Sequence, residues 1–186
     1  CLRHGCDGFE FDVRLSGDGQ AVICHDATFG GISIAAATAD DLALPTLEDV
    51  LRQFAGRAFL DIELKVAGLE RQTVAARVAH PPRKGYVVSS FLTDVLAAVR
   101  DLDPAIPLGL LCDRRDQLRD WRATTAEWVI PHFKLADEEL VEQAHAAGKK
   151  IMVWTVNRAT RMREFAEWGV DAIISDETEL MVRSLR

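Results

Sequence analysis

The sequence lacks the features that would place it in several common classes of protein. It has no apolar run approaching the ~18 residues that a membrane span requires. No glycine-rich GxGxxG or P-loop motif follows any of its candidate strands. Its four cysteines show neither CxxC nor zinc-type spacing. We therefore expect no transmembrane segment, no nucleotide-binding open sheet of the usual kind and no zinc module.

Positive charge is also scarce. The chain carries 22 Lys and Arg residues against 29 Asp and Glu residues, which gives a net charge of −7 and a pI near 5.2. Proteins that bind nucleic acids or anionic membranes need a basic surface, so neither is expected as a partner. A site for a small phosphate-containing molecule stays possible, because local geometry and not net charge creates such a site.

The cysteines carry the available information about compartment. Three of the four lie in or beside apolar strands, where cysteine acts as a small buried hydrophobic residue. This usage favours a reducing environment, and no basic-then-apolar leader is visible at the start of the chain. We therefore expect a cytoplasmic protein, and the sequence leaves its oligomeric state open.

What the chain does contain is a regular alternation of short β-rich runs and longer runs with helical periodicity. Such alternation predicts a parallel sheet with right-handed crossover helices. A short hairpin arm is expected at Ala21–Cys24, after the glycine-rich turn that follows the first strand. The other strands are expected at Gly8–Leu15, Ala58–Val66, Tyr86–Ser90, Pro107–Cys112, Glu127–Pro131, Ile151–Val156 and Ala172–Ser175.

Capping signals mark the expected helices. Thr46 precedes the acidic pair of "TLEDVL", which suits the N-terminus of a helix that Gly56 would close. A second helix should begin at Asp137 and stop at Gly148. A third should run from Arg158 to a glycine stop at Gly169.

Strands joined by one helix per gap predict a TIM (β/α)₈ barrel that forms a single domain over residues 1–186. The sequence supplies seven of the eight strands. The opening stretch "CLRHGCDG" reads as the end of a helix that leads into the second strand of the barrel. We therefore expect the first strand–helix unit to precede Cys1.

Barrel enzymes carry their chemistry at the C-terminal ends of strands, and acidic residues gather on two of the predicted strands. Residues two apart in a strand point to the same face, so Glu10 and Asp12 should project together, as should Asp61, Glu63 and Lys65. Acids at one mouth repel one another unless a cation neutralises them. Three of them, here named the carboxylate triad (Glu10, Asp12 and Glu63), would offer all-oxygen ligation to Mg²⁺ or Ca²⁺. Asp61 lies one step deeper, where a structural role is expected.

Several motifs in order resemble those of the glycerophosphodiester phosphodiesterase family. "GFEFDVRLSGDGQAVICHD" resembles the acid-x-acid strand and His-Asp turn of the family, and "LDIELK" its Glu-x-Lys strand. "LPTLEDVL", "VVSSF" and "AAGKKIMVWTVN" followed by "GVDAIISD" resemble its helix entry and its later strands. The resemblance covers essentially the whole chain. It implies a TIM barrel that hydrolyses glycerophosphodiesters, which are small-molecule substrates, to glycerol 3-phosphate and an alcohol.

The resemblance also implies roles for individual residues. The carboxylate triad would hold a divalent cation, Mg²⁺ or Ca²⁺, and His25 would act as the acid/base. Lys65 would contact the phosphate, and Trp154 would form a wall of the substrate pocket. His132, which directly follows a predicted strand, is a further candidate for the mouth of the barrel.

Two departures from the family pattern keep other readings open. The first strand of the family normally ends in a His-Arg pair, and "RHG" at Arg3–Gly5 is not that pair because it precedes the second strand. The stretch after His25 also lacks the Arg-Thr sequence common there. The alternatives are a catalytically inactive phosphate-binding barrel or fragment, and a phosphodiesterase that acts on lysophospholipids. A strand ending in His-Arg upstream of Cys1 would favour the enzyme.

Overall fold

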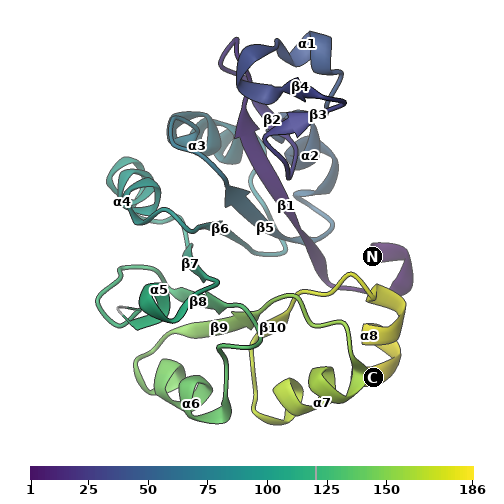
Figure 1. The fold of residues 1–186 in the computed structure, drawn as a ribbon, viewed down its shortest axis with the longest axis vertical. Helices are drawn as coiled ribbons and strands as arrows, with labels where there is room; N and C mark the ends of the chain where they lie inside the picture. Colours follow the sequence, from purple (N-terminus) through teal and green to yellow (C-terminus); the bar gives the residue numbers. More distant parts are fainter. Residues whose placement is uncertain (120) are drawn as a thin grey trace. The chain divides into compact units, whose positions relative to one another are not determined.

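The computed structural model describes residues 1–119 and 121–186, and the chain falls into two compact units (Figure 1). One unit is Glu10–Ile106. The other combines Cys1–Phe9 with Pro107–Arg186. The residues of the carboxylate triad, with Lys65 and His25, all belong to the first unit.

The unit Glu10–Ile106 is built on four strands in the order β6-β5-β1-β2. β5 and β6 are parallel, whereas β2 returns antiparallel to β1 through the predicted hairpin. The strands are β1 (Gly8–Leu15), β2 (Ala21–Ile23), β5 (Phe59–Leu64) and β6 (Tyr86–Ser90), together with a separate small hairpin of β3 (Thr28–Phe29) and β4 (Ile32–Ser33). The helices are the 3₁₀ turn η2 (Ile34–Ala36), α1 (Ala39–Leu42), α2 (Leu47–Phe54), α3 (Glu70–Ala79) and α4 (Thr93–Leu102).

The start of α2 follows the predicted cap. The Thr46 hydroxyl accepts a hydrogen bond from the Asp49 backbone N–H at 3.2 Å, and the Asp49 carboxylate accepts one from the Thr46 N–H at 3.1 Å. This reciprocal capping box satisfies two backbone donors that a helix start otherwise leaves unpaired. The helix ends at Phe54, two residues before the glycine that was expected to close it.

The β1–β2 hairpin also forms as predicted. Its turn places Gly19 at φ +79°, a conformation that residues with a side chain rarely adopt. Val22 in β2 is fully buried and packs in a small cluster with Ile34 and Leu42. The β3–β4 hairpin, by contrast, was not predicted, because its four residues are exposed and show no alternation of apolar and polar side chains.

The second unit holds four parallel strands in the order β10-β9-β8-β7. They are β7 (Leu108–Cys112), β8 (Trp128–Pro131), β9 (Lys150–Val153) and β10 (Ala172–Ile173). The helices are the 3₁₀ turn η1 (Leu2–His4), α5 (Arg115–Arg119), α6 (Glu138–Ala146), α7 (Ala159–Glu167) and α8 (Thr178–Leu185). The helix end expected in "CLRHGCDG" is thus a single short 3₁₀ turn, closed by Gly5 at φ 99°.

Local signals again fix the helices of this unit. The Asp137 carboxylate accepts a hydrogen bond from the Leu140 N–H at 2.9 Å, and Gly148 adopts φ +72° after the end of α6. Gly169 at φ +82° follows α7. β7 ends at Cys112, whose side chain is fully buried, and this burial raises the pKa of the thiol to about 12.

All seven predicted strands are present, with ends that differ by up to three residues. The largest difference is at the end of β9, which stops at Val153 and not at Val156, because its ladder with β10 pairs only Met152 with Ala172 and Val153 with Ile173. Among the helices that the structure describes, none is both long enough and apolar enough to cross a membrane.

Candidate functional site

The site is built on neighbouring strands β1 and β5 of the first unit. In β1, Phe11 and Val13 are buried, and Glu10 and Asp12 occupy the opposite face, as the alternation predicts. In β5, both faces are buried. Leu60, Ile62 and Leu64 form one face and are fully buried, which leaves Asp61 and Glu63 on the other.

These strands bring the carboxylate triad together. Ligand oxygens of Glu10, Asp12 and Glu63 all lie within 4.8 Å of one another. The Lys65 ammonium sits beside them, with Nζ 2.7 Å from Glu63 Oε1 and 3.1 Å from Asp12 Oδ1. Nζ also lies 5.9 Å from the centre of the Phe91 ring. Three acids and one lysine therefore share a single, largely buried site.

The electrostatics of this cluster are unfavourable to three ionised acids. Burial is the main cause that raises the pKa of Glu10 to about 9, and the nearby carboxylates of Asp12, Asp61 and Glu63 raise it further, against the opposing effect of Lys65. Burial likewise raises the pKa of Glu63, although Lys65 opposes this effect. Burial disfavours the charged form of Lys65, but the Glu63 and Asp12 carboxylates outweigh it and raise the pKa of the lysine.

The site fits a hard divalent cation on the evidence of its own oxygens. Glu10 Oε1 is buried without a hydrogen-bond partner among the described residues, which is costly unless something else binds it. One lysine cannot neutralise three carboxylates. A cluster of carboxylate oxygens is the ligand set that Mg²⁺ and Ca²⁺ prefer. Glu10, Asp12 and Glu63 could therefore hold such an ion, with Lys65 left to face an anionic group.

A fourth carboxylate lies in the same row of β5. Asp61 is 2% exposed, and its Oδ1 accepts a hydrogen bond from the Ser89 hydroxyl of β6 at 2.5 Å. Burial raises the pKa of Asp61 to about 7, the Ser89 hydrogen bond opposes this rise, and Glu63 and Asp12 add to it. The sequence placed Asp61 on this face but gave no sign of the Ser89 contact, because that contact joins residues 28 apart in the chain.

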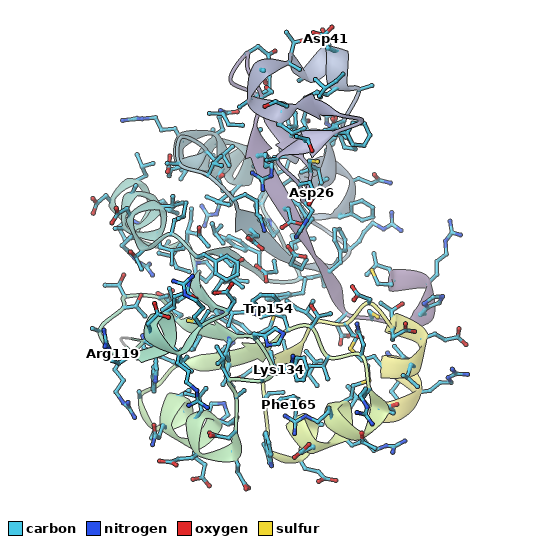
Figure 2. All side chains as sticks on the ribbon, viewed as in Figure 1. Asp26, Asp41, Arg119, Lys134, Trp154 and Phe165 are labelled. Atoms are coloured by element: carbon cyan, nitrogen blue, oxygen red, sulfur yellow. The ribbon has the colours of Figure 1, made fainter. Side chains whose placement is uncertain are left out.

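His25 lies in the bend after β2 and not in a strand. Its side chain is 75% exposed, and its Nδ1 is 2.8 Å from Oδ1 of Asp26, which Figure 2 labels. The His25 carbonyl accepts a hydrogen bond from Arg14 Nε at 2.9 Å, which ties the bend to β1. In the neutral ring, an Nδ1–H that donates to Asp26 leaves the lone pair on Nε2. His25 can therefore exchange a proton with solvent or a ligand through Nε2.

Trp154 and His132 belong to the other unit, Cys1–Phe9 with Pro107–Arg186. Trp154 follows β9 (Figure 2), and its indole N–H donates to the Ile130 carbonyl at 2.9 Å. The His132 ring lies edge-on to it, with centroids 5.3 Å apart. His132 Nδ1 accepts a hydrogen bond from the Lys134 backbone N–H at 3.3 Å. Burial, with the Lys134 charge, lowers the pKa of this histidine, against the opposing effect of Asp113.

Comparison with known proteins adds a second line of evidence. The model of the glycerophosphoryl diester phosphodiesterase family matches residues 31–180. A curated relative, the glycerophosphodiester phosphodiesterase of Caldanaerobacter subterraneus subsp. tengcongensis, is 28% identical over 214 residues, which cover 100% of this chain and 88% of the relative.

Two solved structures resemble the fold. A phosphodiesterase from Oleispira antarctica, solved in complex with the product sn-glycerol-3-phosphate, has a TM-score of 0.84 at 26% identity and covers 98% of this chain and 86% of its own. A glycerophosphoryl diester phosphodiesterase homologue from Silicibacter pomeroyi has a TM-score of 0.89 at 21% identity, with 99% and 84% covered. These likenesses confirm the predicted fold class, an α/β barrel of the TIM type.

Proposed function

Because the chain belongs to the glycerophosphoryl diester phosphodiesterase family, we propose that it hydrolyses glycerophosphodiesters to glycerol 3-phosphate and an alcohol, with a divalent cation held by the carboxylate triad. The observation that carries the proposal is the convergence of three carboxylates within 4.8 Å around an unpartnered buried oxygen. Lys65 beside them supplies positive charge for a phosphate.

The position of each side chain indicates its role in the proposed reaction. Glu10, Asp12 and Glu63 would hold Mg²⁺ or Ca²⁺, which when bound polarises a phosphoryl oxygen and offsets negative charge in the transition state. Lys65 is held in place by its ion pairs with Glu63 and Asp12. Its ammonium would bind a non-bridging phosphate oxygen and orient the diester.

Proton transfer falls to His25 in this proposal. The Asp26 carboxylate orients the ring through Nδ1, which leaves Nε2 to give a proton to the departing alkoxide or to take one from the attacking hydroxyl. Exposure of the ring to solvent lets it exchange its proton with water between turnovers. Trp154 is proposed, on the family resemblance, to form a wall of the substrate pocket.

Turnover of defined substrates tests the proposal. The purified full-length protein would be incubated with glycerophosphocholine, glycerophosphoethanolamine and a lysophospholipid, each with Mg²⁺, with Ca²⁺ and with EDTA. We expect release of glycerol 3-phosphate from the two glycerophosphodiesters with one of the metals, and its loss with EDTA. Absence of hydrolysis in every mixture would favour an inactive phosphate-binding barrel, and turnover of the lysophospholipid alone would favour that substrate class.

Two further expectations belong to the same proposal. We propose that residues 1–186 belong to one phosphodiesterase domain, as the order of the motifs along the chain suggests. We also propose a cytoplasmic location, on the evidence of the cysteine usage.

A further inference from the structure

Asp61 is a buried acid that the proposed reaction does not use. It is 2% exposed, and only one of its two oxygens, Oδ1, is bonded, to the Ser89 hydroxyl. Oδ2 is buried without a hydrogen-bond partner among the described residues. Burial of an unpartnered carboxylate oxygen costs free energy, so a group retained in this state calls for an explanation.

The surroundings of Asp61 make its charge more costly still. It shares one face of β5 with Glu63, two residues further on, and it interacts electrostatically with Glu63, Asp12 and Glu10. Each of these is an acid. Like charges at short range in a poorly solvated site repel one another strongly. A fourth acid here is therefore unfavourable for folding alone.

A purely structural role accounts for only half of the side chain. The Ser89 hydroxyl needs an acceptor, and a neutral amide oxygen would provide one without burying a charge. The second oxygen, Oδ2, has no hydrogen-bond partner among the described residues, and the Ser89 contact does not require the negative charge. Both become favourable when a cation lies in the adjacent triad, because Mg²⁺ and Ca²⁺ carry water ligands that need hydrogen-bond acceptors.

We propose that Asp61 is a positioning residue of the metal centre. Through Oδ2 it accepts hydrogen bonds from the hydration shell of the cation that the carboxylate triad holds, and Ser89 fixes its orientation from β6. It also adds a fourth negative charge behind the three ligands. This inference rests on the proposed function, since it requires a divalent cation at the triad.

Asp61→Asn separates this role from a structural one. The amide keeps the size of the side chain and an oxygen for the Ser89 hydroxyl, but it removes the charge. Titration calorimetry with MgCl₂ and with CaCl₂, in the absence of substrate, should show Kd raised by about 10–100-fold, the usual effect of losing an outer-sphere partner. Without metal, the Tm of the variant should be higher than that of the parent, because a repelled buried charge is gone.

The proposal thus predicts that Asp61→Asn binds the cation more weakly but is more stable without it. Saturating Mg²⁺ should therefore raise the Tm of Asp61→Asn less than it raises that of the parent. Asp103→Asn is the matched control. It removes one negative charge from an acid that is paired with Arg77 at 3.3 Å, so it should leave both metal affinities unchanged and lower the metal-free Tm.

Ser89→Ala is the second variant, and it decides the question if Asp61→Asn does not fold. Loss of the hydroxyl frees Asp61 from its fixed orientation, so the Kd for the cation should again rise. The inference is wrong if the parent binds Mg²⁺ or Ca²⁺ and the folded variants bind it within twofold of the parent. If the parent binds neither ion, the metal dependence in the proposed function fails first, and the inference fails with it.

Discussion

The candidate site brings three carboxylates that repel one another together with a single lysine. Lys65 pairs with Glu63 and Asp12 and so neutralises part of the triad, while Glu10 keeps an unpartnered buried oxygen. Fully satisfied buried networks stabilise a fold, and partly satisfied ones do not. The unsatisfied part of this network is therefore the part most sensitive to a bound cation.

Replacement of Glu63 by Gln tests the ligand set. The change removes one charged ligand with little change in volume, and Lys65 keeps its ion pair with Asp12. We expect Kd for Mg²⁺ or Ca²⁺ to rise by roughly tenfold or more in a calorimetric titration, because hard cations depend on charged oxygen ligands. Glu142→Gln, at an exposed position of α6, is the control for net charge. Unaltered affinity in Glu63→Gln would remove this residue from the ligand set.

Replacement of His25 by Ala tests proton transfer. Loss of a positioned acid or base usually lowers the rate by roughly 10²–10⁴-fold, so kcat should fall by that factor. Affinity for the cation should change little, since the triad is untouched. His145→Ala serves as the control, because this histidine pairs with Asp171 in the other unit. A loss of less than tenfold in His25→Ala would point to a structural role for the ring.

At the scale of single elements, α2 offers a clean measurement. Thr46→Ala removes the hydroxyl that accepts from the Asp49 N–H, and loss of such a cap costs about 0.5–2 kcal/mol of folding free energy. Urea unfolding should show a lower midpoint with an unchanged slope. Thr46→Ser, which keeps the hydroxyl, should stay close to the parent. Equal midpoints for Thr46→Ala and the parent would mean that the capping box contributes nothing measurable.

Elements were predictable from the sequence where their determinants are local. The caps at Thr46 and Asp137 and the glycine stops at Gly148 and Gly169 lie within a few residues of the helix ends that they define, and the structure has them in place. Strand ends were less predictable, because a strand ends where its partner ends, as the short β9–β10 ladder illustrates.

The same distinction holds in the candidate site. Alternation along β1 and β5 predicted that Glu10 and Asp12, and Asp61 and Glu63, share their faces, and the structure brings the triad and Lys65 together. The contact of Ser89 with Asp61 was not predictable, because it depends on the register between β5 and β6. The roles of the site residues in catalysis stay predictions.

At the scale of the whole molecule, net charge governs the approach of substrate. A chain with a charge of −7 repels an anionic diester, and salt screens this repulsion over a Debye length of about 8 Å at 0.15 M. For glycerophosphoglycerol, kcat/KM should therefore rise roughly two- to fivefold between low and physiological ionic strength, with the metal kept saturating.

Glycerophosphocholine provides the control, since it carries no net charge and should respond little to salt. The measurement is a pair of initial-rate series with the same enzyme stock and added NaCl. A fall in kcat/KM for the anionic substrate would contradict the prediction. It would mean that the local field of Lys65 and the cation outweighs the charge of the rest of the chain.

Because Cys112 is buried at the end of β7, its chemical labelling can report the local unfolding of that strand. The thiolate is the form of cysteine that attacks an alkylating reagent. The Cys112 thiol is both fully buried and held protonated by its high pKa, whereas Cys1 is exposed. A maleimide should consequently label Cys1 at once and reach Cys112 only when β7 separates from its neighbours. Mass spectrometry of the labelled chain over time would then measure how often that strand opens under native conditions, with no added probe.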